Sequence, residues 1–253
     1  MILQAKNLTK VFGGVIANKE INLSVEEGTV TALIGPNGSG KTTFINQVSG
    51  VLKPTSGQIL FKDKDITSLE AHDISRIGIA RTFQKIRLFE KLTVIENVLV
   101  ARRKFFKCGF LDIVFHTKRL KNEEKEQLDI ALNLLQRLGL ADEAWKMPGE
   151  LPYGKRRALE IARALALEPK LLLLDEPAAG MTRNEFASII DIIQKLKEQG
   201  ITMLLVEHTM AFIRETSDKV YVLNFGEIIA EGTFEEIEHD PAVVAAYLGE
   251  ESV

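Results

Sequence analysis

The chain has 253 residues, of which 45% are hydrophobic, and this is enough to bury a substantial core. Its charged residues are well mixed and sum to a formal net charge of −3, which argues against a nucleic-acid binder because such proteins usually carry a basic surplus. The single cysteine, Cys108, excludes an internal disulfide framework and is typical of a reducing cytosol.

Apolar runs are short throughout the chain. The longest, such as 171–174 and 203–206, fall far below the ~20 residues that span a bilayer. The start of the chain, MILQAKNLTKVFGG, lacks the basic residues and apolar stretch of a signal peptide. We therefore expect a soluble chain that reaches a membrane only through a partner.

The N-terminal part predicts antiparallel β-structure. One strand is expected over Leu3–Phe12, and apolar residues alternate with polar ones over 21–25 in the next. The segment 58–66 reads as another hairpin that turns near Asp63 and Lys64.

From Thr29 onward, short apolar strands are each followed by a helical segment. The three strands read TVTALIG, LLLLDEP and ITMLLVEH, and the last two are separated by a helix with apolar residues at 3.6-residue spacing over 186–196. Alternation of this kind predicts an α/β fold with a mainly parallel sheet covered on both faces. A final hairpin over 219–232 is expected to turn at 225–226.

The middle of the chain, 97–147, carries no β pattern. The segment 122–140 places its leucines and alanine at helical spacing, with Gly139 as a C-terminal stop. We expect a helical subdomain over 97–147 inserted into one α/β domain that comprises 1–96 and 148–253.

A glycine-rich loop follows the first apolar strand and precedes helix-forming sequence. It consists of Gly35, Pro36, Asn37, Gly38, Ser39, Gly40, Lys41, Thr42 and Thr43. This is the phosphate-loop pattern in the context that the pattern requires, which favours phosphate binding over an ordinary strand-to-helix turn. Lys41 supplies a cation for the β- and γ-phosphates, and the Thr42 hydroxyl can ligate Mg²⁺.

Two acids, Asp175 and Glu176, end the strand LLLLDEP, at the edge where ligands bind in open parallel sheets. Alone, such a pair more often caps a loop. After a phosphate loop, the pattern favours Asp175 in the Mg²⁺ shell and Glu176 as the general base that polarises the attacking water.

Three further residues are weak signals in isolation. His208 ends the strand ITMLLVEH and is either structural or in contact with the γ-phosphate. Gln84, in RTFQ, is either an ordinary polar residue or a weak Mg²⁺ ligand that senses the γ-phosphate. Phe12, before Gly13 and Gly14, is either a core aromatic or a flat face for adenine.

These motifs together resemble the ATP-binding-cassette family. Phe12, GPNGSGKT, Gln84, LPYGK, LLLLDEP and His208 occur in the family's order and approximate spacing across about 200 residues. The resemblance implies a phosphate-loop ATPase core with an antiparallel β subdomain and an inserted helical subdomain.

The resemblance also implies roles for these residues. Phe12 stacks on adenine, Thr42 and Gln84 ligate Mg²⁺, Glu176 is the general base and His208 is the γ-phosphate switch. ATP and Mg²⁺ are the implied cofactors. Two subunits form a head-to-tail dimer in which the signature loop, LPYGK at 151–155, closes over the partner's ATP and Gly154 contributes its N–H.

The signature loop departs from the family's usual LSGGQ. Pro152 stands where a serine hydroxyl would contact the γ-phosphate, and losing one hydrogen bond to a charged group costs about 1.5–3 kcal/mol. Lys155 replaces glutamine and is a candidate compensating cation. The Gly154 N–H and the helix start behind it are expected to remain available to the anion.

A second departure is Thr182, which stands where the family often has an aspartate. Thr182 and Glu185 predict a capping box for the next helix. Together with Pro152, this departure suggests pairing with a different ATPase, so that one ATP site is better than the other. Pairing of two identical subunits is the alternative.

Several segments resemble one branch of the family, the ATPase subunits of bacterial branched-chain amino-acid importers. They are RTFQ, RLFEKLTVIENVLVA, DEPAAGM and AVVAAYLG. Alternatives are the ATPases of urea importers and lipopolysaccharide exporters, or a non-transport cassette ATPase. The branch implies two transmembrane permease subunits, indirect work with an extracytoplasmic substrate-binding protein, no nucleic acid, and a peripheral place on the cytoplasmic side of the membrane.

The basic-aromatic run at 101–110, ARRKFFKCGF, has two interpretations. It is either a solvated helical face with some buried aromatics or a contact near the cytosolic membrane surface.

Overall fold

The computed structural model describes residues 1–109, 112 and 114–248. Phe110, at the end of the basic-aromatic run, and Gly249, at the end of AVVAAYLG, lie outside these residues. The chain divides into two compact units. The first unit contains 1–84, 170–180 and 189–253, and the second contains 85–169 and 181–188.

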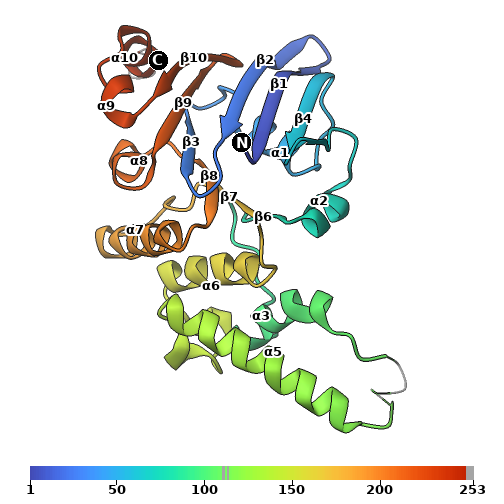
Figure 1. Cartoon of the computed structure of the whole chain (residues 1–253). Coiled ribbons are helices and arrows are strands. Elements are labelled where there is room, and N and C mark those ends of the chain that lie inside the picture. The colour runs from blue at the N-terminus through green and yellow to red at the C-terminus, as the bar shows by residue number, and fades with distance from the viewer. Residues whose placement is uncertain (110–111, 113, 249–253) are drawn as a thin grey trace. The chain divides into compact units, whose positions relative to one another are not determined.

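An antiparallel sheet of four strands lies in the first unit, in the order β2-β1-β4-β5 (Figure 1). Its strands are β1 (Leu3–Phe12), β2 (Val15–Val25), β4 (Ser56–Phe61) and β5 (Lys64–Asp65). The predicted antiparallel start of the chain is therefore confirmed. The β4–β5 turn falls at 62–63, one residue earlier than expected, and both turn residues have positive φ.

A six-stranded sheet forms the second layer of the first unit, in the order β10-β9-β3-β8-β7-β6. Its strands are β3 (Val30–Ile34), β6 (Ile79–Arg81), β7 (Leu171–Asp175), β8 (Thr202–Val206), β9 (Lys219–Asn224) and β10 (Glu227–Gly232). All neighbours are parallel except β9 and β10, which form the hairpin predicted to turn at 225–226. The mainly parallel sheet is confirmed.

Helix α1 (Lys41–Val48) joins the two sheets into one core. Its buried residues Phe44, Ile45 and Val48 belong to the same apolar cluster as strand residues of both sheets. The phosphate loop runs directly into this helix, so burial of α1 fixes the loop.

The remaining helices of the first unit are short. They are α2 (Ala71–Ile77), α8 (Met210–Thr216), α9 (Phe234–Ile237) and α10 (Pro241–Leu248). Helix α7 (Arg183–Glu198) belongs to the second unit over its first residues and to the first unit from Ile189 onward.

The second unit is built on three helices that contact one another, α3 (Val94–Arg102), α5 (Lys118–Arg137) and α6 (Tyr153–Leu165). Its short 3-10 helices are η1 (Arg103–Phe105), η2 (Ala141–Glu143) and η3 (Pro148–Glu150). The predicted helix over 122–140 is present but begins earlier, at Lys118, because the Thr117 side chain accepts a hydrogen bond from the Leu120 N–H.

The segment 97–147, predicted as a helical subdomain, lies inside this second unit, which also contains the signature loop and 181–188. A buried ion pair between Arg157 and Glu160, 2.7 Å apart, lies within α6. Among the described residues, no helix is both long and apolar enough to cross a bilayer.

Candidate nucleotide site

The phosphate loop connects β3 to α1 and is pressed against neighbouring strands. A Cβ at Gly40, where φ is 110°, would lie 2.3 Å from the backbone oxygen of Ala17 in β2. A Cβ at Gly35 would lie 2.0 Å from the backbone oxygen of Leu223 in β9. These two glycines are therefore required by close contact with strands as well as by the turn itself.

Lys41 lies at the centre of the loop and is buried. Its ammonium donates to the backbone oxygens of Gly35 and Pro36, at 2.7 Å each. Thr42, the next residue of the loop, is exposed. The cation predicted to bind phosphate is thus held by the loop's own carbonyl groups.

The predicted Mg²⁺ ligand Asp175 ends β7 and is buried in an ion pair that the sequence did not suggest. Arg81, in the neighbouring β6, donates to its Oδ2 at 2.8 Å, and the Asp175 side chain is 3% exposed. The same guanidinium donates to Asn46 of α1 at 2.6 Å and to Ser49, the residue that follows this helix, at 2.9 Å. Asp175 is therefore held in place by a cation that is itself tied to the helix behind the phosphate loop.

Glu176 follows Asp175 in a strained left-handed conformation, with φ of 47°. A non-glycine residue in this region costs of order 1–3 kcal/mol, and such strain clusters at functional sites. The Gln84 amide nitrogen donates to Glu176 Oε2 at 3.0 Å. The structure therefore brings together two predicted site residues that are 92 positions apart in the chain.

His208 follows β8, which is parallel to β7, and its side chain is half exposed. Its neighbour Glu207 was not assigned from sequence and is completely buried. The Glu207 carboxylate accepts hydrogen bonds from the backbone of both the Glu176 loop and the His208 loop.

Phe12 lies at the end of β1 with nearly half of its surface exposed, so the core-aromatic interpretation is wrong. Val15 and Ile16, its neighbours across the hairpin, are also exposed. The Lys10 ammonium lies 5.1 Å from the centre of the Phe12 ring. An exposed aromatic flanked by apolar side chains is compatible with stacking on a flat base.

These features are matched by known proteins. Residues 18–179 match the model of the family described as ABC transporter, and 227–253 match a model described as branched-chain amino acid ATP-binding cassette transporter. The chain belongs to the ABC transporter family. The predicted family, α/β fold and ATPase class are thereby confirmed.

Relatives of this ABC ATPase match it over nearly full length. The high-affinity branched-chain amino acid transport ATP-binding protein BraF of Pseudomonas aeruginosa is 42% identical over 250 residues, 98% of both chains. The ADP conformation of MJ1267, an ATP-binding cassette of an ABC transporter, has a TM-score of 0.85 at 37% identity and 98% coverage of both chains. A dimeric structure of MJ0796, a bacterial ABC transporter cassette, has a TM-score of 0.77 at 27% identity, covering 92% of this chain and 98% of that one.

The signature loop of this ABC ATPase lies in the second unit, where α6 begins. The Gly154 N–H donates to Glu185 Oε1 at 2.7 Å, so the N–H expected to be available to an anion is engaged by a carboxylate of the chain. Glu185 Oε2 accepts from the Thr182 N–H and hydroxyl, at 3.0 and 2.7 Å, as a capping box requires. These hydrogen bonds lower the pKa of Glu185, and the bond from the Gly154 N–H has the largest effect.

Lys155, expected as a compensating cation, is paired within the same unit. Its ammonium lies 2.5 Å from Glu143 Oε1, and this hydrogen bond lowers the pKa of Glu143. Lys155 must leave Glu143 before it can act on a phosphate.

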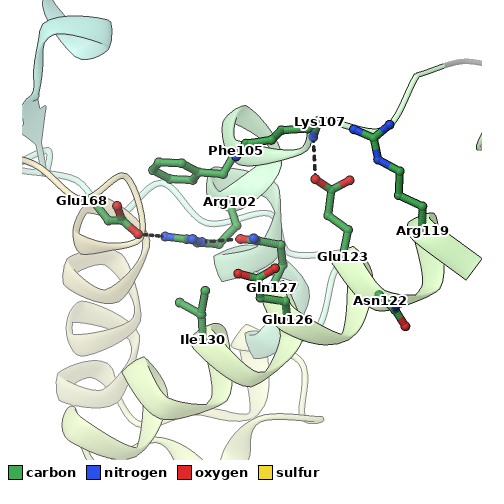
Figure 2. A pocket seen from close by; sticks show the side chains of 10 residues that line it. All are labelled: Arg102, Phe105, Lys107, Arg119, Asn122, Glu123, Glu126, Gln127, Ile130 and Glu168. Atoms are coloured by element: carbon green, nitrogen blue, oxygen red, sulfur yellow. Dashed lines mark hydrogen bonds and ion pairs between the residues drawn. The ribbon is translucent and has the colours of Figure 1, made fainter.

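The basic-aromatic run lies beside a cavity of about 730 Å³ in the second unit (Figure 2). Arg102 is buried, stacks 4.1 Å from the Phe105 ring centre, and donates to Gln127 and Glu168. Arg102 is therefore a structural residue, and the solvated-face interpretation is wrong for it. Nearby, a hydrogen bond with Glu123 raises the pKa of Cys108 to about 11.

Proposed function

We propose that this ABC ATPase hydrolyses Mg²⁺-ATP to power import of branched-chain amino acids across the cytoplasmic membrane. The observation that carries the proposal is the meeting of Gln84 and Glu176 at the end of β7, beside the buried Asp175 and one strand from His208. Strand β3, which is separated from β7 by β8 in the sheet, leads into the phosphate loop.

The residues present fit a Mg²⁺ ion held mainly by nucleotide. Thr42, Gln84 and Asp175 supply one hydroxyl, one amide and one carboxylate, all oxygen donors of the kind that Mg²⁺ prefers. Among the described residues there is no group of three or more His, Cys, Asp or Glu side chains that could hold a metal. When bound, the ion neutralises charge that develops on the transferred phosphoryl group.

Glu176 is the general base in this proposal. The hydrogen bond from Gln84 holds one carboxylate oxygen, and the strained backbone fixes the direction of the side chain. The base accepts a proton from the attacking water while Lys41 and the loop N–H groups hold the phosphates.

The nucleotide also closes a pair of subunits. Phe12 stacks on adenine, His208 contacts the γ-phosphate, and Gly154 of a partner contributes its N–H from the opposite side. The existence of dimeric cassettes in the family supports this arrangement. Binding of ATP between two subunits then shifts them to the closed state.

The cargo assignment rests on the full-length relatives, whose names specify branched-chain amino acid transport. It implies two transmembrane permease subunits, an extracytoplasmic substrate-binding protein that acts indirectly, and a peripheral position on the cytoplasmic face. The basic-aromatic run at 101–110 remains a candidate membrane-side contact, through Arg103, Lys104 and Lys107 rather than through the buried Arg102.

The partner ATPase is proposed to be a different chain. Pro152 and Thr182 both lack the usual family contacts, so a pair with a complementary subunit would contain one stronger and one weaker site. Strong cooperative hydrolysis by the purified protein alone, equal at both sites, would contradict this.

The general-base assignment is tested by Glu176→Gln. Steady-state phosphate release should fall about 100- to 10,000-fold, because Gln cannot accept the proton, while ATP still binds. Glu198→Gln, which removes an exposed carboxylate from the end of α7, is the matched control and should leave the rate unchanged.

The closed state is tested by gel filtration of Glu176→Gln with ATP. We expect a stable dimer, alone or with the partner ATPase. A monomer in both conditions would reject ATP-driven closure.

Affinity purification from solubilised membranes should recover this protein together with two permeases and a second ATPase. If it is recovered with neither permeases nor a second ATPase, the transport assignment is rejected.

A further inference from the structure

Glu207 is a fully buried carboxylate for which the proposed mechanism has no role. It follows β8 immediately and precedes the proposed γ-phosphate contact, His208. A buried charge is costly unless hydrogen bonds compensate it, so its partners indicate what it holds in place.

Those partners are backbone N–H groups of two different loops. Oε1 accepts from the Ala178 N–H at 2.9 Å, two residues after Glu176. Oε2 accepts from the N–H groups of His208 and Thr209, at 2.9 and 3.2 Å. One carboxylate therefore joins the loop that carries the general base to the loop that carries the γ-phosphate contact.

The Glu207 backbone extends the connection to a third element. Its N–H donates to the Leu33 backbone oxygen at 3.3 Å, in the strand that leads into the phosphate loop. On the other side, the Glu176 N–H donates to the Val206 backbone oxygen at 2.8 Å. Glu207 thus lies where the three strand ends β3, β7 and β8 come together.

The His208 ring is close to the same carboxylate. Its Nδ1 lies 3.7 Å from Glu207 Oε2, beyond hydrogen-bond distance but near enough for electrostatic attraction when the ring is protonated. The imidazole is half exposed, and Glu207 binds the backbone N–H of the residue that carries it.

We propose that Glu207 is a positioning residue for ATP hydrolysis, which sets the distance between Glu176 and His208 by binding the backbone of both loops. The inference rests on the proposed roles of Glu176 and His208. Glu207 does not touch nucleotide in this proposal; it acts through the two loops. Because both carboxylate oxygens accept N–H groups, a carboxamide cannot replace the carboxylate.

The test is Glu207→Gln, with Glu207→Asp as the second variant and Glu198→Gln as the control for loss of one negative charge. In the Glu207→Gln variant, the amide nitrogen replaces one of the two oxygens and faces a backbone N–H group, whichever way the amide is turned. In Asp, the charge stays but the shorter side chain cannot span from Ala178 to His208. Both variants should therefore separate the two loops.

We expect kcat for phosphate release to fall about 10- to 100-fold in both variants, because a misplacement of about 1 Å is enough for such a loss. The affinity for ATP should stay within about 3-fold of the parent, since the phosphate loop is unchanged. In amide NMR spectra, the Ala178 and His208 resonances should shift, while those of the phosphate loop stay in place.

A purely structural role predicts a different result. Loss of ATP affinity and kcat together, or unchanged kcat with shifted amides, would overturn the inference. Glu176→Gln, measured in the same assay, separates failure of the general-base proposal from failure of the positioning proposal. If Glu176→Gln leaves hydrolysis intact, the general-base proposal fails. If Glu176→Gln is inactive while Glu207→Gln and Glu207→Asp keep full kcat, only the positioning role fails.

Discussion

The phosphate loop and the signature loop are both short segments that lead into a helix, and they hold their polar groups in opposite ways. In the phosphate loop, the cation of Lys41 is bound by backbone carbonyl groups. In the signature loop, the Gly154 N–H is bound by the anion of Glu185. A triphosphate attracts the Lys41 ammonium and repels the Glu185 carboxylate. The second loop must therefore release a carboxylate before it can accept a phosphate, whereas the first loop holds its cation with neutral carbonyl groups.

In this comparison of the two loops, the largest expected effect comes from the Lys41 cation. Lys41→Ala should lower hydrolysis about 100- to 1000-fold, because it removes charge stabilisation from the phosphates. Phosphate release and ATP binding, measured by titration calorimetry, check this. Lys155→Ala is the matched control in the signature loop, and a loss as large as that of Lys41→Ala would contradict the contrast.

One glycine in each loop, Gly40 and Gly154, allows the two loops to be compared by the free energy of unfolding. Gly40→Ala should destabilise the fold by about 2–4 kcal/mol, because its Cβ meets backbone and its φ is unfavourable. At Gly154, the three atoms nearest to a Cβ belong to the Glu185 side chain, with Cγ at 2.8 Å and Cβ at 2.9 Å, and φ is not positive. Gly154→Ala should therefore cost less, about 1–2 kcal/mol, because it displaces Glu185 and weakens the bond from the Gly154 N–H. Chemical denaturation measures both, and equal losses would refute the distinction.

Removing the competing anion should have a smaller effect in the favourable direction. Glu185→Gln removes the charge that repels phosphate and keeps one acceptor oxygen, so either the bond from the Gly154 N–H or the cap bond from the Thr182 N–H is lost. ATP-driven association should tighten about 3- to 10-fold in a Glu176→Gln background. Sedimentation with ATP measures this, with Glu198→Gln as control. Weaker association would show that the carboxylate supports the loop instead.

The smallest effect concerns Lys155 and Glu143. Lys155→Met should destabilise the second unit by less than about 1 kcal/mol at pH 7, since the Lys155 side chain is 43% exposed. The pair lowers the pKa of Glu143, so its stabilisation is present above the unfolded pKa and is lost as pH falls through the folded one. The difference from the parent should therefore shrink as pH falls below the unfolded pKa and vanish once Glu143 is protonated in the folded state. A difference that persists there would contradict the linkage.

Much of the fold followed from local patterns. Strands such as LLLLDEP and the phosphate loop carry their own signals, so β7, β3 and α1 were predictable. The family resemblance implied separate roles for Gln84 and Glu176 at one nucleotide site, but their hydrogen bond was not predicted, because nothing local joins residues so far apart.

Other features depended on tertiary neighbours and had no sequence pattern. The Thr182–Glu185 pair predicted a local cap, but the second oxygen of Glu185 binds Gly154, which lies 31 residues earlier. Nothing local in RTFQ distinguishes Arg81, because its partner Asp175 lies on the adjacent strand. The sequence signal for Glu207 is a charged residue directly after a buried strand.

The left-handed backbone of Glu176 has a consequence for laboratory evolution. Glycine would relieve the strain at this position, and asparagine tolerates it better than glutamate does. A selection for thermal resistance alone would therefore favour replacement of the proposed catalytic base. Screens that improve this protein should score turnover in every round, because heat tolerance and activity conflict at this one residue.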